Sequence, residues 1–107
     1  MKNVVFIFLI LIVFACSSFY IEVPGITADK DKVNKGDKVT LSWEIRSNTE
    51  FEIWIETDVD NTPLFKDLPL KGSREVVVNS TTTFYLKAQS KNKNLEGGSS
   101  VKVTVVN

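Results

Sequence analysis

Strict alternation between apolar and polar residues constrains this chain more than any other feature. From Val39 to Arg46, the apolar residues Val39, Leu41, Trp43 and Ile45 alternate with polar ones. Successive residues of a β-strand point to opposite faces of a sheet, so this stretch predicts a strand with one apolar face. We expect that face, including the indole ring of Trp43, to lie in the core.

The same period continues in the second half of the chain. The next alternation places Trp54 outward, between Glu52 and Glu56. Tyr85 and Lys87 point outward by the same argument. The residues predicted to point inward on these later strands are Phe51, Ile53 and Ile55, then Val76 and Val78, then Phe84, Leu86 and Ala88, and finally Val101, Val103 and Val105.

Clusters of Gly, Pro, Asn, Asp and Lys separate these alternations, and no window repeats at helical spacing. A first strand is expected from Ile21 to Ala28, broken near Pro24 and Gly25, and a weak strand around residues 64–68. Together these give about seven short strands, the number and spacing typical of an antiparallel β-sandwich. The sequence therefore predicts an all-β fold in one small domain.

Two motifs resemble strands of a known family of sandwiches. Residues 36–43, with the sequence GDKVTLSW, resemble the second strand of bacterial immunoglobulin-like and fibronectin type III domains, and residues 80–88 resemble their sixth strand. The resemblance implies an immunoglobulin-like antiparallel β-sandwich over residues 21–107. The family's corner tyrosine aligns with Phe84, so either the corner is held without that hydroxyl or the predicted register is off by one residue.

Charge and composition exclude several classes of function. The chain has thirteen basic and thirteen acidic residues, and removal of Lys2 with a leader leaves 12 − 13 = −1. This balance argues against a nucleic-acid partner, because phosphates select dense Lys and Arg surfaces. The chain has no histidine, which excludes Ser-His and Cys-His catalytic pairs and every zinc site that contains histidine. We expect no cofactor and no bound metal.

The N-terminus has the layout of a secretory signal. Lys2 gives a positive start, an unbroken apolar run follows from Val4 to Ala15, and the single cysteine, Cys16, comes next. A helix of about twelve residues spans roughly 18 Å, well short of the roughly 30 Å hydrocarbon core of a bilayer. A permanent transmembrane helix is therefore disfavoured.

Residues 13–16, with the sequence VFAC, resemble the lipobox of bacterial lipoproteins, although the bulky Phe14 departs from its usual pattern. The resemblance implies that residues 1–15 are a cleaved leader and that the Cys16 thiol carries a diacylglycerol. Residues 16–20 then tether the domain to a membrane, because two acyl chains suffice for stable attachment.

Two other fates of the N-terminus stay open from the residues alone. Ordinary cleavage after Ala15 also suits a small-residue site, and an uncleaved anchor is the other alternative. Ser17 after the cysteine favours the outer membrane or the cell surface over the inner membrane. The expected localisation is therefore export, with lipid anchoring to a bacterial membrane.

One outward surface is a candidate binding site. In an immunoglobulin-like topology the strands around Trp54 and Tyr85 are neighbours, so both rings would lie on one exposed face. Exposed aromatic rings rimmed by charge suit protein or carbohydrate recognition. The alternative is a lone surface tryptophan, or one covered by the 57–69 connection. The other members of the predicted patch are Lys87, Glu52 and Glu56, with Lys102 and Thr104 around them.

Three hypotheses of function follow. The first is a membrane-tethered, non-catalytic binding or structural module for a protein or glycan of the envelope. The second is an accessory or assembly component that pairs an exposed edge, residues 21–28 or 101–106, with another chain. The third is a small hydrolase with Glu52 and Glu56 as a carboxylate pair, disfavoured because an open, wet sheet does not separate their pKa values. Residues 58–61 carry oxygen ligands but are interpreted as a turn.

Overall fold

The computed structural model of the protein describes residues 20–59, 62–91 and 95–106. The predicted leader, 1–15, and the predicted lipid acceptor, Cys16, lie outside these described residues. No helix in the described part of the chain has the length and apolarity needed to span a membrane. The described strands are β1 (Ile21–Ala28), β2 (Lys32–Val33), β3 (Asp37–Ser47), β4 (Phe51–Thr57), β5 (Lys71–Val78), β6 (Thr82–Ser90) and β7 (Glu96–Val105).

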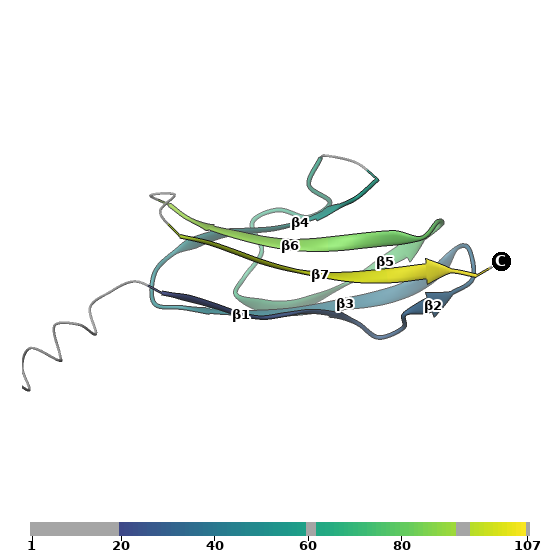
Figure 1. The fold of residues 1–107 in the computed structure, drawn as a ribbon, viewed down its shortest axis with the longest axis horizontal. Coiled ribbons are helices and arrows are strands. Elements are labelled where there is room, and N and C mark those ends of the chain that lie inside the picture. Colours follow the sequence, from purple (N-terminus) through teal and green to yellow (C-terminus); the bar gives the residue numbers. More distant parts are fainter. Residues whose placement is uncertain (1–19, 60–61, 92–94, 107) are drawn as a thin grey trace, which may run out of the picture.

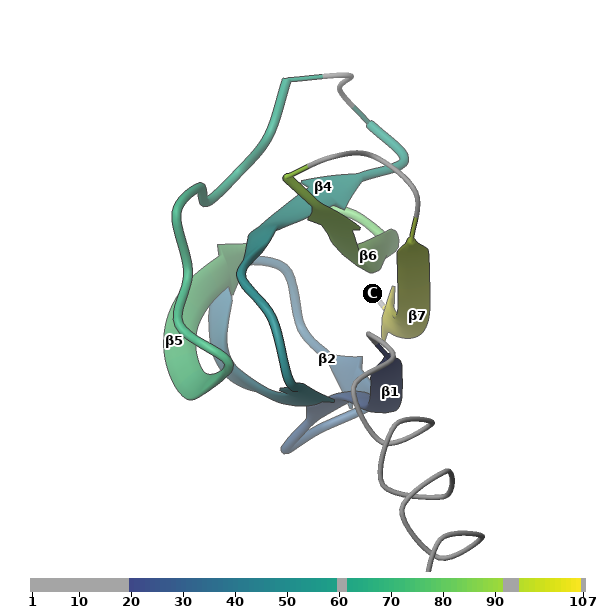
Figure 2. The ribbon, with the colours of Figure 1, turned by 90° about the vertical axis from the view of Figure 1, so that its left-hand side faces the viewer.

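The strands form two layers that pack face to face (Figures 1 and 2). One sheet has the order β1-β3-β5 and the other β2-β7-β6-β4. Neighbouring strands are antiparallel except for β2, which pairs with β7 in parallel. This arrangement confirms the predicted all-β sandwich, and its strand order is compatible with an immunoglobulin-like fold.

The inward row of β3 lies at the centre of the core. Val39, Leu41, Trp43 and Ile45 are between 0 and 3% exposed, as their alternation predicted. Ile53, Ile55, Leu86 and Val103 face them from the second sheet and are equally buried. Phe51, Val101 and Val105, which were also predicted to point inward, are only partly buried and pack against the margin of the core.

Trp43 is fixed by a hydrogen bond at the polar end of its indole and by close packing against Gly72. Its Nε1 donates a hydrogen bond to the Pro69 carbonyl oxygen at 3.0 Å, which satisfies the polar end of a side chain that is otherwise buried. Gly72 pairs with Trp43 across β3 and β5. A Cβ at Gly72 would lie 3.0 Å from the indole ring, so the absent side chain leaves the space that the ring occupies.

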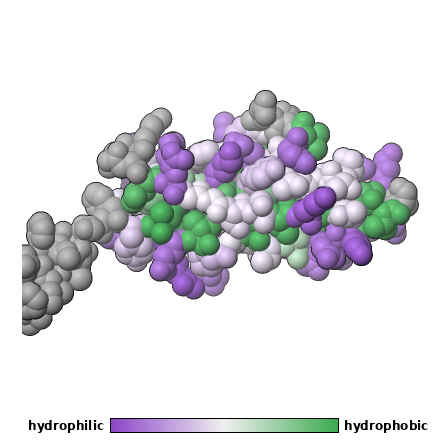
Figure 3. Space-filling model, viewed as in Figure 1, coloured by the Kyte–Doolittle hydropathy of each residue, from purple (hydrophilic) through white to green (hydrophobic). Residues whose placement is uncertain are grey.

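The two sheets meet along β1 and β7, which run side by side (Figures 1 and 2). The register of β1 shifts between Glu22 and Gly25, and Gly25 has a φ of 128° that favours glycine. Beyond this bulge, the Ile26 amide donates to Ser99 Oγ of β7 at 3.3 Å. The predicted break near Pro24 and Gly25 is thus a bulge within one strand. In Figure 3, hydrophobic side chains form a broken line along the molecule between hydrophilic ones.

The corner before β6 is held without a tyrosine hydroxyl. Phe84 is buried, which confirms the predicted register and shows that the alternative of a one-residue slip was wrong. Hydroxyls of the neighbouring threonines bond to the backbone instead. Thr82 Oγ1 donates to the Ser80 carbonyl at 2.7 Å, and Thr81 Oγ1 accepts from the Val105 amide at 3.0 Å.

The prediction of a strand around residues 64–68 was wrong. This segment forms only an isolated bridge, between Phe65 and Ile55. Prolines lacking an amide hydrogen flank the segment at positions 63 and 69, and Asp67 has a φ of 54°, outside the β region. The connection from β4 to β5 therefore follows the edge of β4 without becoming a strand.

The structure contains a short strand, β2, that the sequence did not indicate. β2 lies against the end of β7, where the Thr104 amide donates to the Asp31 carbonyl and the Val106 amide to the Val33 carbonyl, at 2.9 and 3.0 Å. The expectation that residues 101–106 are a free edge is therefore wrong for residues 104–106, where β2 lies against β7. Residues 21–28 do form an edge strand of their sheet, although β7 lies beside them.

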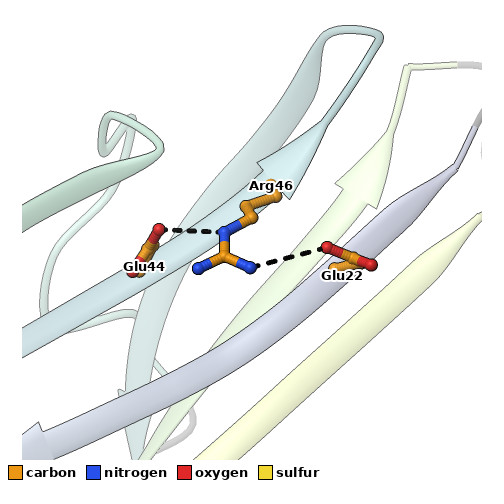
Figure 4. A network of polar contacts seen from close by, with 3 residues as sticks. All are labelled: Glu22, Glu44 and Arg46. Atoms are coloured by element: carbon orange, nitrogen blue, oxygen red, sulfur yellow. Dashed lines mark hydrogen bonds and ion pairs between the residues drawn. The ribbon is translucent and has the colours of Figure 1, made fainter.

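The outer face of the three-stranded sheet carries exposed charge. Arg46 of β3 lies between Glu44 on the same strand and Glu22 on β1 (Figure 4). Its nitrogen atoms lie 3.1 Å from Glu44 Oε2 and 3.8 Å from Glu22 Oε1. Such exposed ion pairs contribute at most about 1 kcal/mol to stability, so this face serves mainly to keep the sheet solvated.

We predict that Gly72→Val destabilises the full chain, because the new side chain meets the Trp43 ring. Overpacking of this kind lowers the free energy of unfolding by about 1 to 3 kcal/mol. Urea unfolding followed by circular dichroism measures the change. Ser73→Val is the matched control on the next, exposed position, and it should change stability by no more than about 0.5 kcal/mol. Equal stability of the two variants would contradict the packing described for Trp43.

Candidate binding face

The outer face of the four-stranded sheet brings the predicted patch together. β4 and β6 pair so that Trp54 lies opposite Lys87 and Glu56 opposite Tyr85. Glu52 lies at the end of the same row, opposite Gln89. Since the alternating residues Ile53, Ile55, Leu86 and Ala88 are buried, these patch residues share the opposite, outward face.

One carboxylate links the centre of this face. Trp54 Nε1 donates to Glu56 Oε2 at 2.7 Å, and Lys87 Nζ lies 3.3 Å from Glu56 Oε1. Both oxygens of Glu56 are therefore engaged, one by each neighbour. We call Trp54, Glu56, Lys87 and Tyr85 the β4/β6 patch.

The surroundings of Glu56 favour its ionised form. The hydrogen bond from Trp54 is the largest influence and lowers the pKa of the Glu56 carboxyl below its ordinary value. Lys87 lowers the pKa further through its own hydrogen bond and charge, while partial burial opposes both. Glu56 is thus negatively charged at neutral pH and fixed in position.

The aromatic rings of the patch are not equally exposed. Tyr85 is 37% exposed, whereas Trp54 is partly buried. The connection after β4 bonds along the strand's edge through Leu64 and Phe65, whose backbone groups pair with Ile55. Trp54 therefore keeps part of its surface open to solvent, next to the charged pair of Glu56 and Lys87.

A shallow depression of about 510 Å³ adjoins the patch on β7. Gly98 lies opposite Lys87 and Ser100 opposite Tyr85, so Gly98 leaves a gap in the outward row. A Cβ at Gly98 would approach the Leu86 carbonyl oxygen to 3.0 Å, which explains the absence of a side chain there. The clusters of Gly, Asn and Lys over residues 91–100 predict a turn there, but this is wrong for Gly97 and Gly98, because β7 begins at Glu96.

The two carboxylates proposed as a hydrolase pair do not lie close together. Trp54 stands between Glu52 and Glu56, and four residues of strand span about 13 Å. Paired carboxylates in glycosidases are at most about 9.5 Å apart. With Glu56 held ionised by Trp54 and Lys87, the face offers rigid contact area and fixed charge.

Residues at the margins of the patch have local roles. Lys102 of β7 lies opposite Thr83 of β6, two residue pairs from the pair of Tyr85 and Ser100. Asp58 fixes the start of the β4–β5 connection to β6, because its carboxylate accepts a hydrogen bond from the Thr83 amide at 3.1 Å. Its neighbours at 60 and 61 lie outside the described residues. Among the residues that the structure describes, no three Cys, Asp or Glu side chains are grouped so as to hold a metal ion.

Comparison with protein-family models, with curated proteins and with solved structures gave no match for this chain. The strand pairing and the side-chain contacts therefore carry the functional argument.

We predict that Trp54→Phe raises the pKa of Glu56, because phenylalanine keeps the ring but lacks the N–H donor. Since the folded-state pKa of Glu56 is lowered, its ionisation stabilises the fold above the ordinary pKa. That stabilisation is lost as pH falls through the lowered pKa. Carboxyl-carbon NMR titration of both proteins measures the pKa directly.

Glu50 provides the internal control for this titration. Its pKa is lowered by Lys91, with which it forms a 2.9 Å ion pair, and Trp54 has no part in that shift. The Glu50 midpoint should therefore be the same in both proteins. An unchanged Glu56 midpoint in Trp54→Phe would show that the indole hydrogen bond does not hold the carboxylate.

Proposed function

We propose that this protein is an exported bacterial lipoprotein with a non-catalytic β-sandwich that binds a protein or glycan of the cell envelope. A lipid on Cys16 tethers the domain to the membrane. The β4/β6 patch makes the contact with the partner.

The observation that carries the binding proposal is the organisation around Glu56. Its two oxygens engage Trp54 and Lys87 at 2.7 and 3.3 Å, so an aromatic ring and an ion pair are fixed side by side on an outward face. A fixed aromatic side chain loses little conformational entropy when a partner binds, which favours recognition. The ion pair of Glu56 and Lys87 is partly exposed, and the core beneath it is formed by other residues.

The tether proposal rests on the sequence of the N-terminus. A positive start, an apolar run of twelve residues and the lipobox-like sequence at 13–16 precede a domain whose first strand begins at Ile21. Since a chain extends at most about 3.6 Å per residue, the few residues from Cys16 to Ile21 hold the domain within about 20 Å of its lipid. Its partner therefore lies close to the membrane surface.

The second candidate is an assembly component that pairs a strand edge with another chain. β1 and β5 are the edge strands of the first sheet and offer such an edge, whereas β2 covers the end of the expected edge at 101–106.

We predict that Cys16→Ser abolishes attachment of lipid to the protein. Without a thiol there is no site for the diacylglycerol, so labelled palmitate should not enter the variant and the uncleaved precursor should accumulate. Metabolic labelling and fractionation of cells expressing the full chain measure both effects. Ser17→Ala is the matched control and should label normally. Equal labelling of Cys16→Ser would contradict the lipid tether.

We predict that the double variant Trp54→Ala and Tyr85→Ala loses partner capture by the immobilised protein from envelope extracts. Removal of both rings deletes the aromatic contact area of the patch while leaving the core intact. The melting temperature should fall by no more than a few degrees. Tyr20→Ala removes an exposed aromatic ring at the start of β1 and should leave capture unchanged. Undiminished capture by the double variant would refute the patch.

A further inference from the structure

The outer edges of the two sheets are protected to different degrees. The connection after β4 bonds along the edge of that strand. The Leu64 amide donates to the Ile55 carbonyl at 2.7 Å, and the Leu68 amide donates to the Ile53 carbonyl at 3.1 Å. β1 has β7 beside it, whereas β5 lies at the other side of the sandwich, where the connection from β4 runs down toward it (Figure 2).

The backbone of β5 presents hydrogen-bonding groups at the edge that does not pair with β3. The carbonyls of Leu70 and Val78 point toward β3, because they accept from the amides of Ile45 and Gly36 at 2.7 and 2.8 Å. Backbone groups of alternate strand residues point to opposite edges. The amides and carbonyls of Ser73, Glu75 and Val77 therefore face outward, and no hydrogen bond from a described residue reaches them.

An apolar groove of about 500 Å³ opens beside the same edge. Val59, Leu64 and Val77 line it and are 67%, 44% and 54% exposed. These are three of the seven large apolar side chains that are exposed among the described residues. Exposed apolar residues that gather in one place, instead of being scattered, mark an interaction surface.

The last three residues of β5 lack the protection usual for a free strand, whereas Lys71, Arg74 and Glu75 carry charge in the rest of it. Natural edge strands are blunted by charged side chains, prolines or bulges. The last three residues of β5, Val76 to Val78, carry no charge and no proline, and the pairing of β5 with β3 has no register shift. The edge is thus fit to accept another strand.

We propose that β5 pairs antiparallel with β5 of a second copy of this chain, about a two-fold axis at Val77. The two three-stranded sheets then join into one continuous sheet across the dimer. This inference does not depend on the lipid tether or on the β4/β6 patch.

The residues of this edge favour a second copy of the chain as the partner and Val77 as the position of the two-fold axis. Residues that lie opposite each other in such a pair must both belong to the outward-bonding set. An axis at Val77 sets the two exposed valines against each other and Glu75 against Asn79. An axis at Glu75 would oppose two carboxylates, which is destabilising. The same patch serves both copies, as a two-fold interface requires.

The groove adds apolar area to the same contact. Leu64 and Val59 lie on the connection next to β5, so a second copy at this edge brings its own exposed apolar residues against them. The exposed apolar side chains on this side of the molecule are buried together, and each copy supplies the same set.

Cysteine cross-linking of the full chain in cells tests the proposal. In Val77→Cys the two thiols lie opposite each other, about 5.5 Å apart at Cα, within the range for a disulfide. We expect a covalent dimer, in several-fold higher yield than for Glu75→Cys, which faces Asn79. The unmodified chain and Ser100→Cys, on the outer face of the other sheet, measure the background from Cys16 and from random collision.

A background yield for Val77→Cys would overturn the proposal, and a higher yield for Glu75→Cys would overturn the register. Val77→Lys gives an independent test, because it opposes two positive charges at the axis. Sedimentation of the full chain in detergent should show a dimer that becomes monomeric in Val77→Lys, with an unchanged circular dichroism spectrum. A monomeric unmodified chain, or a folded Val77→Lys dimer, would contradict the interface.

Discussion

The burial of one row of β3 side chains between two sheets is the constraint on which the rest of the structure depends. Val39, Leu41, Trp43 and Ile45 fill the centre of the core, and both β1 and β5 pair with the strand that carries them. Because the side-chain period of a strand is two residues, burial of one row fixes which row faces solvent. The same rule on β4 and β6 places Trp54 and Tyr85 outward.

The sequence predicted the elements whose alternation is long and regular. β3, β4 and β6 were expected with the observed inward and outward faces, and β1 was expected with its break at Pro24 and Gly25. Apolar and polar residues alternate strongly in these strands. Shorter elements were not predictable in this way. β2 has only two residues and exists because Asp31 and Val33 bond to β7, a contact that no local pattern encodes.

Two errors have opposite physical causes: in one, packing against another strand overrides local turn chemistry, and in the other, local backbone chemistry prevents a strand. Gly97 and Gly98 suggest a turn, yet both lie in β7, where side chains would meet Val23 and the Leu86 carbonyl. Conversely, residues 64–68 look like a weak strand but bond to β4 only in part.

The candidate site was predictable in its position but not in its contacts. Alternation and topology bring Trp54, Tyr85 and Lys87 to one face, and pairing of β4 with β6 confirms it. The hydrogen bond from Trp54 to Glu56 depends on rotamers, which a pattern of residue types does not specify. The open edge of β5 likewise became visible only when the strand order was known.

The outward placement of Trp54 against the inward placement of Trp43 is the central claim, and the two indole N–H signals in a proton–nitrogen NMR spectrum test it directly. Trp43, buried and bonded to the Pro69 carbonyl, should resist a soluble paramagnetic agent, while the partly exposed Trp54 should be broadened. Broadening of Trp43 with protection of Trp54 would contradict the account.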